Sequence, residues 1–184
     1  MNRLTTAKSN EWEQFSPYFK QREVPAKTIL LAEGQISRTM FFIKKGCLRT
    51  WINNDGKEIT TQFFFEGDSV SSIESFRTNQ PSLYSIESLE PCILNTISQQ
   101  DFQSIIESSP ELKKILEDRL FRRLFQSQQL LYSFLKNTPQ KRYEELIEQH
   151  PHIVQRVPQH YIASYLGITS VSLSRIRSRR KLTS

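Results

Sequence analysis

Residues 25–68 read PAKTILLAEGQISRTMFFIKKGCLRTWINNDGKEITTQFFFEGD, and this stretch decides the fold class of the N-terminal half. Short apolar and β-branched runs alternate in it with Gly, Asn, Asp and Pro, a pattern typical of strands and turns. The clearest hairpin turns at residues 53–56, Asn-Asn-Asp-Gly, which tolerate positive φ. Its first strand alternates between faces, with Leu48, Thr50 and Ile52 on one and Cys47, Arg49 and Trp51 on the other. So many strands within residues 23–98 predict a small barrel or jelly roll that closes its own edges.

After residue 98 the apolar spacing changes to that of helices. Residues 99–107 predict a short helix, and Ser109-Pro110-Glu111 opens a longer one with proline in its first turn. This second helix runs to about residue 136, spans about 39 Å and carries a broad apolar stripe. We expect part of the stripe to meet a second copy of the chain, the alternative being a helix packed wholly on its own domain. The dimer contact would be made by Leu116, Leu120, Leu124 and Leu131.

The last quarter of the chain holds most of the positive charge. Residues 137–184 contain eight Lys/Arg and three Asp/Glu, a net of +5 out of the chain's +6. Asn137-Thr138-Pro139 ends the long helix, residues 140–149 predict another helix, and residues 152–158 are expected to be a connection. A basic terminal module beside a nearly neutral body indicates a polyanionic partner, most often nucleic acid.

Residues 159–180 have the spacing of a helix-turn-helix, which needs a small residue at the crossing, a turn residue that tolerates positive φ, and apolar residues between the helices. The positions that carry the expected types are Ile162, Ala163, Leu166, Gly167, Ile168, Leu173 and Ile176. The second helix would then lie in a major groove, where one of its sides contacts base edges. The residues on that side are Ser170, Val171, Ser174 and Arg175. Side chains suited to phosphate oxygens are Thr169, Ser172, Arg177, Arg179 and Lys181. A basic helical hairpin that contacts a partner protein or nothing is the alternative.

These features resemble the cyclic-AMP receptor/FNR superfamily of bacterial transcription regulators. The resemblance covers roughly residues 20–181 and rests on landmarks that fall in the family's order, namely Gly34, Lys45-Gly46, Gly56-Lys57-Glu58, Gly67-Asp68 and LGITSVSLSRIR. It implies an α+β fold, with a cyclic-nucleotide-binding-type β-roll at 1–108, a dimerisation helix at 109–137 and a helix-turn-helix domain at 138–184. It also implies a homodimer on palindromic double-stranded DNA, RNA polymerase as a partner, and Ser170, Val171 and Arg175 as the base readers.

The effector site departs from the family pattern. Cyclic-nucleotide binders place a glutamate on the ribose hydroxyl and an Arg-Ser-Ala motif on the cyclic phosphate. The matching positions here are Ser72 for the glutamate, Ser82 for the arginine and Leu83 for the serine. Without the arginine, the cyclic phosphate loses a charge-assisted hydrogen bond worth about 1.5–3 kcal/mol, so tight cyclic-AMP binding is not expected. Arg77 is the alternative phosphate ligand. Further pocket candidates are Glu74 and Tyr84, for an effector that the sequence does not identify.

Other function classes find less support in the residues. His150, His152 and His160 all lie outside the β region, so composition excludes a histidine metal site inside the roll. Without a Gly-x-Ser-x-Gly elbow or a phosphate loop, neither an enzyme nor a cofactor is expected. A small-molecule or nucleotide sensor whose output is a protein contact is the second hypothesis.

The remaining expectations concern location and chain ends. Cys47 and Cys92 are expected to be core residues in a reducing cytoplasm. No apolar run of about 18 residues predicts a membrane span, and the first residues lack an apolar signal core. The β-hairpin wing of some family members is not expected, because the sequence stops at Ser184.

Overall fold

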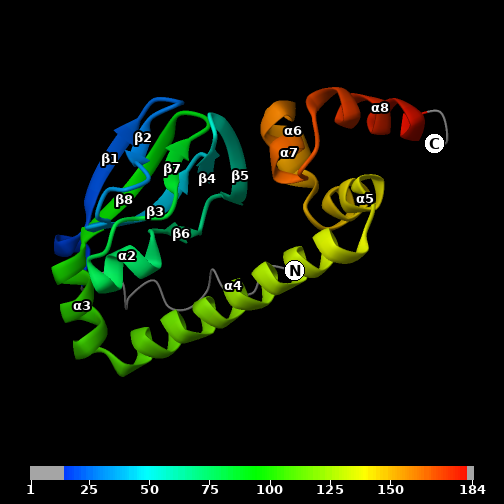
Figure 1. Ribbon diagram of the computed structural model, residues 1–184. Helices are drawn as coiled ribbons and strands as arrows, with labels where there is room; N and C mark the ends of the chain where they lie inside the picture. Colours follow the sequence, from blue (N-terminus) through cyan, green and yellow to red (C-terminus); the bar gives the residue numbers. More distant parts are fainter. Residues whose placement is uncertain (1–14, 182–184) are drawn as a thin grey trace. The chain divides into compact units, whose positions relative to one another are not determined.

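The computed structural model describes residues 15–181, which form two compact units (Figure 1). The first unit contains residues 15–50 and 63–113, and the second contains residues 51–62 and 114–181. Among the described helices, none combines the length and the apolarity that crossing a bilayer requires.

Two four-stranded sheets make up the β-structure, one with strand order β1-β8-β3-β6 and the other with order β2-β7-β4-β5. Antiparallel pairs join β8 to β1 and β3, β3 to β6, and β2 to β7. The strands are β1 (Lys20–Val24), β2 (Ile29–Leu31), β3 (Thr39–Lys45), β4 (Leu48–Asn54), β5 (Lys57–Phe64), β6 (Ser69–Val70), β7 (Ser85–Ser88) and β8 (Cys92–Ser98). This arrangement confirms the predicted jelly-roll type of sheet.

Apolar side chains from strands of both sheets form one core cluster. Leu48, Ile86 and Leu94 are fully buried in it, and complete burial of such a side chain contributes about 1.5–3 kcal/mol. Cys47 and Cys92 are buried thiols in the core, as expected from the sequence. The cluster comprises Val24, Leu31, Phe41, Ile43, Leu48, Phe64, Val70, Ile86, Cys92 and Leu94.

The hairpin between β4 and β5 turns where the sequence predicts it. Asp55 and Gly56 both have positive φ, 52° and 82°, which is the requirement of a two-residue type I′ turn. The Gly56 N–H donates to Asn53 Oδ1 at 2.9 Å and closes the turn. The local chemistry of the sequence therefore determines this hairpin.

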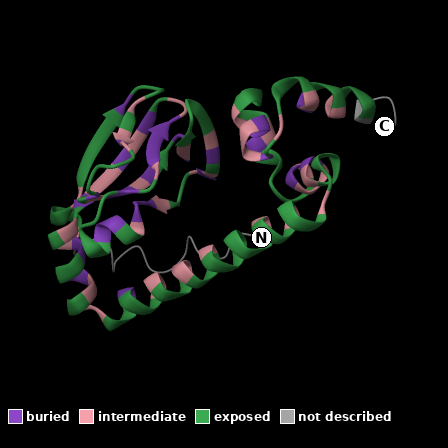
Figure 2. Ribbon diagram, in the orientation of Figure 1, coloured by how far each residue is buried: buried purple, intermediate pink, exposed green. Residues whose placement is uncertain are grey.

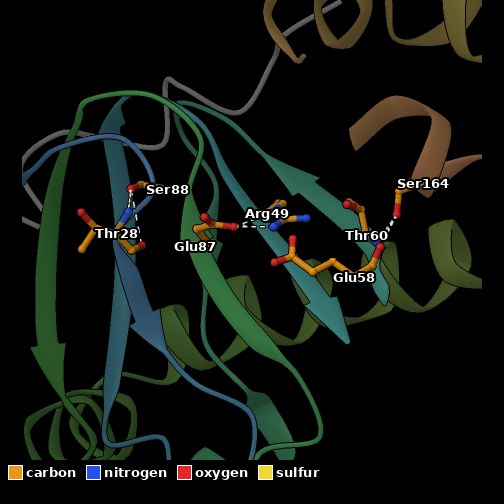
Figure 3. Close-up of polar contacts among 7 residues, drawn as sticks. All are labelled: Thr28, Arg49, Glu58, Thr60, Glu87, Ser88 and Ser164. Atoms are coloured by element: carbon orange, nitrogen blue, oxygen red, sulfur yellow. Dashed lines mark hydrogen bonds and ion pairs between the residues drawn. The ribbon is translucent and has the colours of Figure 1, made fainter. Parts of the chain in front are cut away.

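The first residues of β4 are buried on both faces, which simple alternation does not predict. Leu48 and Thr50 on one face are buried, and so is Arg49 on the other, with 1% of its surface exposed. Arg49 is paired with buried Glu87 of β7: Nε and Nη2 lie 2.7 and 2.6 Å from Glu87 Oε2 (Figure 3). Beside this pair, Thr28 N donates to Ser88 Oγ at 2.9 Å.

Short helices lie before, within and after the β-strands in the sequence, and α4 to α8 then complete the chain (Figure 1). They are the 3-10 helix η1 (Ser16–Tyr18), α2 (Ile73–Thr78), α3 (Gln99–Ser108), α4 (Pro110–Lys136), α5 (Pro139–Gln149), α6 (Pro151–Arg156), α7 (Gln159–Tyr165) and α8 (Ser170–Lys181). The predicted connection at 152–158 is wrong over most of its length, because Pro151 opens α6 at the position where a missing N–H costs no hydrogen bond. Helix α2 was also not predicted.

Candidate nucleic-acid interface

Helices α7 and α8 form a helix-turn-helix around a small apolar core. Ile162, Ala163 and Leu173 are each 1% exposed, and Ile176 is half-buried. Gly167 lies in the turn with a φ of 68°, the left-handed conformation that the spacing requires. The Ile168 N–H donates to Ala163 O at 2.9 Å and completes the turn.

The predicted base-reading side chains share one exposed face of α8. Positions i, i+1, i+4 and i+5 of a helix lie on the same side, and all four residues there are exposed. Val171 is the most informative, because an apolar side chain that stays 61% exposed is available to a methyl group of a partner. The four are Ser170, Val171, Ser174 and Arg175.

The predicted phosphate-contacting residues lie in more varied environments. Thr169 is exposed and acts as the N-cap of α8, since its Oγ1 accepts from Ser172 N at 3.1 Å and lies 3.0 Å from Ser172 Oγ. Arg177 is half-buried and lines a polar cleft of about 230 Å³ together with Gln159, Ser174 and Ser178. Arg179 is exposed. The side chain of Lys181 is not among the described parts of the structure. The region where a wing would follow α8 also lies outside the described residues.

Ser164 of α7 makes a contact that sequence reasoning missed. Its hydroxyl donates to Glu58 O at 2.9 Å and accepts from Thr60 N at 2.9 Å, so it bonds two backbone groups of β5 (Figure 3). β5 is the terminal strand of its sheet, so Ser164 bonds to an edge strand. A serine 104 residues away from Thr60 in sequence gives no local signal of such a contact.

Replacing Ser164 with alanine should therefore speed hydrogen exchange at the Thr60 amide. The loss of one hydrogen bond is worth about 1 kcal/mol, or about fivefold in exchange rate. Hydrogen exchange with mass spectrometry measures the change. Ser178→Ala is the control, because its hydroxyl donates to Ser174 O within α8; equal effects in both variants would contradict the assignment.

The residues proposed for an effector pocket are only partly brought together. Ser72 and Ser82 are buried and Tyr84 is half-buried, but Glu74 is exposed and Leu83 is 68% exposed. The two exposed side chains therefore do not line an interior site with the serines.

The polar atoms around Ser82 bond to one another. Ser82 Oγ donates to Tyr84 O at 2.6 Å, and the Tyr84 hydroxyl donates to Ser71 O at 3.0 Å. Ser71 Oγ lies 2.9 Å from Ser37 Oγ. The alternative phosphate ligand, Arg77, is exposed on α2. The serines here complete a neutral hydrogen-bond network instead of presenting a cation.

Reactive or metal-binding groups are not prominent in residues 15–181. No set of three or more His, Cys, Asp or Glu side chains gathers there as possible metal ligands. Burial raises the pKa of the Cys92 thiol, and the nearby Glu90 carboxylate acts in the same direction. This thiol is therefore a poor nucleophile at neutral pH.

Comparison with known proteins agrees with the geometry. The cyclic nucleotide-binding domain family matches residues 21–109. The cAMP-activated global transcriptional regulator CRP of Pasteurella multocida is 27% identical over 115 residues, which cover 62% of this chain and 54% of that protein. The CRP of Escherichia coli O157:H7 is 25% identical over the same share of each chain. The match thus spans about half the length of these curated relatives, which are transcription regulators.

Solved structures extend the similarity over the whole chain at the level of the fold. A CooA mutant from Carboxydothermus hydrogenoformans matches with a TM-score of 0.79 and 19% identity, covering 100% of this chain and 85% of that one. The c-di-GMP responsive global regulator CLP of Xanthomonas campestris matches with a TM-score of 0.75 and 17% identity, covering 96% and 93%. The chain thus carries a domain that matches the cyclic nucleotide-binding domain family, and it is similar to Crp/Fnr-type transcription regulators in this domain and in its fold.

Proposed function

We propose that the chain is a homodimeric, sequence-specific DNA-binding transcription regulator that acts at palindromic sites. The observation that carries this proposal is α8, which presents an exposed polar and basic face on a buried helix-turn-helix core. In the proposal, Ser170, Val171, Ser174 and Arg175 contact base edges. Backbone phosphates are contacted by Thr169, Ser172, Arg177, Arg179 and Lys181. RNA polymerase is the further partner that the resemblance implies.

The dimer is proposed from the apolar surface of α4. Figure 2 shows this helix exposed along most of its length, and only Leu112 of it is buried. Leu116 and Leu120 are half-buried, and Leu124 and Leu131 are 50% and 56% exposed. Apolar surface of this extent on one helix is typical of an association surface. Other exposed apolar side chains on α4 are Phe121, Phe125, Tyr132, Phe134 and Leu135.

The sensor roll is proposed not to bind cyclic AMP in the way of its relatives. Binding would place a charged phosphate beside Ser82, where the described contacts offer neutral hydroxyl and carbonyl groups. Without a cation the desolvation of the phosphate is not offset. The roll would then bind an effector of another kind, or no effector.

Selection of duplexes from a random library with purified protein tests these points together. The proposal expects an inverted repeat, an affinity that falls steeply as salt rises, and no change in yield when cyclic AMP is added. A protein that binds a small molecule but shows no salt-sensitive DNA affinity would instead support the sensor with a protein output.

Replacing Arg175 with alanine should reduce base discrimination at one position of each half-site. The loss of a bidentate contact to a base edge is worth about 1–3 kcal/mol of discrimination. Competition binding with all four bases at each position measures it. Arg179→Ala is the matched control, since loss of a phosphate contact should weaken all sequences equally. Equal loss on random DNA for both variants would overturn the base-reading role of Arg175.

A further inference from the structure

One guanidinium, that of Arg142 in the first turns of α5, contacts two segments of the second unit, the C-terminal end of α4 and the C-terminal end of α7. Its Nη1 donates to Asn137 O at 2.8 Å and its Nη2 donates to Leu166 O at 2.8 Å. Its central carbon lies 4.6 Å from the centre of the Phe134 ring. These partners belong to the last turn of α4, to the residue that follows α4, and to the C-cap of α7.

The chemistry of these partners suits a guanidinium. Asn137 O and Leu166 O lie at the C-terminal ends of two helices, where carbonyl groups lack helical donors and the helix dipole is negative. A planar, permanently charged group with several donors can serve both ends and stack on an aromatic ring at the same time. Within the described residues, Arg142 Nε is buried without a hydrogen-bond partner. The two Nη contacts and the ring therefore determine how the group is oriented.

Two further contacts join the same segments. A Cβ at Gly167 would lie 3.0 Å from Phe134 Cε1, so the turn of the helix-turn-helix touches the end of α4 directly. Glu145 of α5 accepts from Ser133 Oγ at 2.7 Å and from Asn137 Nδ2 at 2.8 Å. The end of α4, the start of α5 and the turn before α8 are thus linked at several points.

We propose that Arg142 is a positioning residue for DNA recognition. It holds the turn between α7 and α8 against the C-terminal end of α4. The inference rests on the proposed function, because only a dimer that reads two half-sites needs this arrangement. Half-sites of a palindrome lie about 34–36 Å apart and in a fixed helical phase. A two-residue connection, Asn137-Thr138, joins α4 to α5. Without Arg142 the helix-turn-helix could pivot there, and binding both half-sites would cost more conformational entropy.

Half-site spacing gives a readout that a loss of stability alone would not change. Duplexes carrying the selected inverted repeat, with zero, one or two base pairs inserted at its centre, are titrated with wild type, Arg142→Met and Lys141→Met. Wild type should lose about 100-fold in affinity when two base pairs are inserted, since the second half-site is both displaced and rotated. Arg142→Met should bind the optimal spacing about tenfold more weakly, yet lose less than tenfold on insertion. Lys141→Met removes the same charge from the exposed neighbouring residue and should behave as wild type.

A distance measurement tests the arrangement without DNA. Nitroxides are attached at Gln128→Cys on α4 and Ser178→Cys on α8, both exposed positions, and the labelled chain is diluted with unlabelled chain. Electron–electron dipolar spectroscopy should give one narrow distance distribution for the wild-type background and a broader one for Arg142→Met. Arg142→Lys, which keeps the charge and one donor contact, should restore part of the narrow distribution and part of the spacing penalty.

Each result has a defined consequence. Unchanged distance distributions and unchanged spacing penalties in Arg142→Met would overturn the proposal. Equal loss on every spacing, together with a lowered thermal midpoint, would assign Arg142 a stabilising role only and would also overturn it. If wild type selects no duplex, the proposed function fails, while the distance distributions still decide whether Arg142 fixes the turn.

Discussion

Replacement of Glu87 by alanine is expected to destabilise the β-roll by about 3–5 kcal/mol. The carboxylate is the partner of Arg49 Nε and Nη2, and the two side chains are 1% and 9% exposed. Removal of Glu87 takes away the carboxylate that Nε and Nη2 of the buried guanidinium contact, and with it the part of the desolvation cost that this contact offsets. Chemical denaturation of the purified variant, followed by circular dichroism, measures the change in the free energy of unfolding.

The double variant Arg49→Met/Glu87→Met is the informative control. Because both charges are removed and the volume is largely kept, its stability should lie much closer to wild type than that of Glu87→Ala. A double variant as unstable as the single one would show that packing around these side chains, and not an uncompensated charge, determines the loss.

Introduction of glutamates at Leu124 and Leu131 should convert the protein to a monomer and lower its affinity for the selected palindrome by more than about 100-fold. Both leucines expose half or more of their surface on α4. A carboxylate at each would have to be buried, next to its symmetry mate, for the dimer to form. A monomer holds one helix-turn-helix, so it loses the effective concentration that links the two half-sites.

Sedimentation and DNA titration together check this prediction. Gln126→Glu/Gln129→Glu is the matched control, since it adds the same charge at exposed polar positions of α4. A dimeric Leu124→Glu/Leu131→Glu variant with unchanged DNA affinity would place the dimer contact elsewhere.

Most of the fold could be predicted because its determinants are local. The turn at Asp55-Gly56 needs residues that tolerate positive φ, and Gly167 needs the same in the helix-turn-helix. Proline was the ambiguous signal: Pro151 marks the end of one helix as well as the first position of the next. The six residues of α2 are too few for a helical period to be recognised.

The site could be predicted only where it lies on one helix. The exposed face of α8 follows from spacing within twelve residues. The Arg49–Glu87 pair joins residues 38 positions apart, and Arg142 reaches Leu166 from 24 positions away. Such pairings depend on how strands and helices pack, and periodicity carries no information about them. Alignment with the family's motif likewise did not indicate that Leu83 would be exposed.

The Ser164 contact has a consequence for solubility. The edge groups of β5 that Ser164 bonds, Glu58 O and Thr60 N, are those through which a sheet recruits a further strand. The Ser164 hydroxyl occupies these two backbone groups, so another strand cannot pair with β5 at this point. Because Ser164 lies in a helix, it does not itself provide an edge to which a further strand could pair. A chain truncated before α7 would leave these groups open to another molecule, and self-association through β5 would follow.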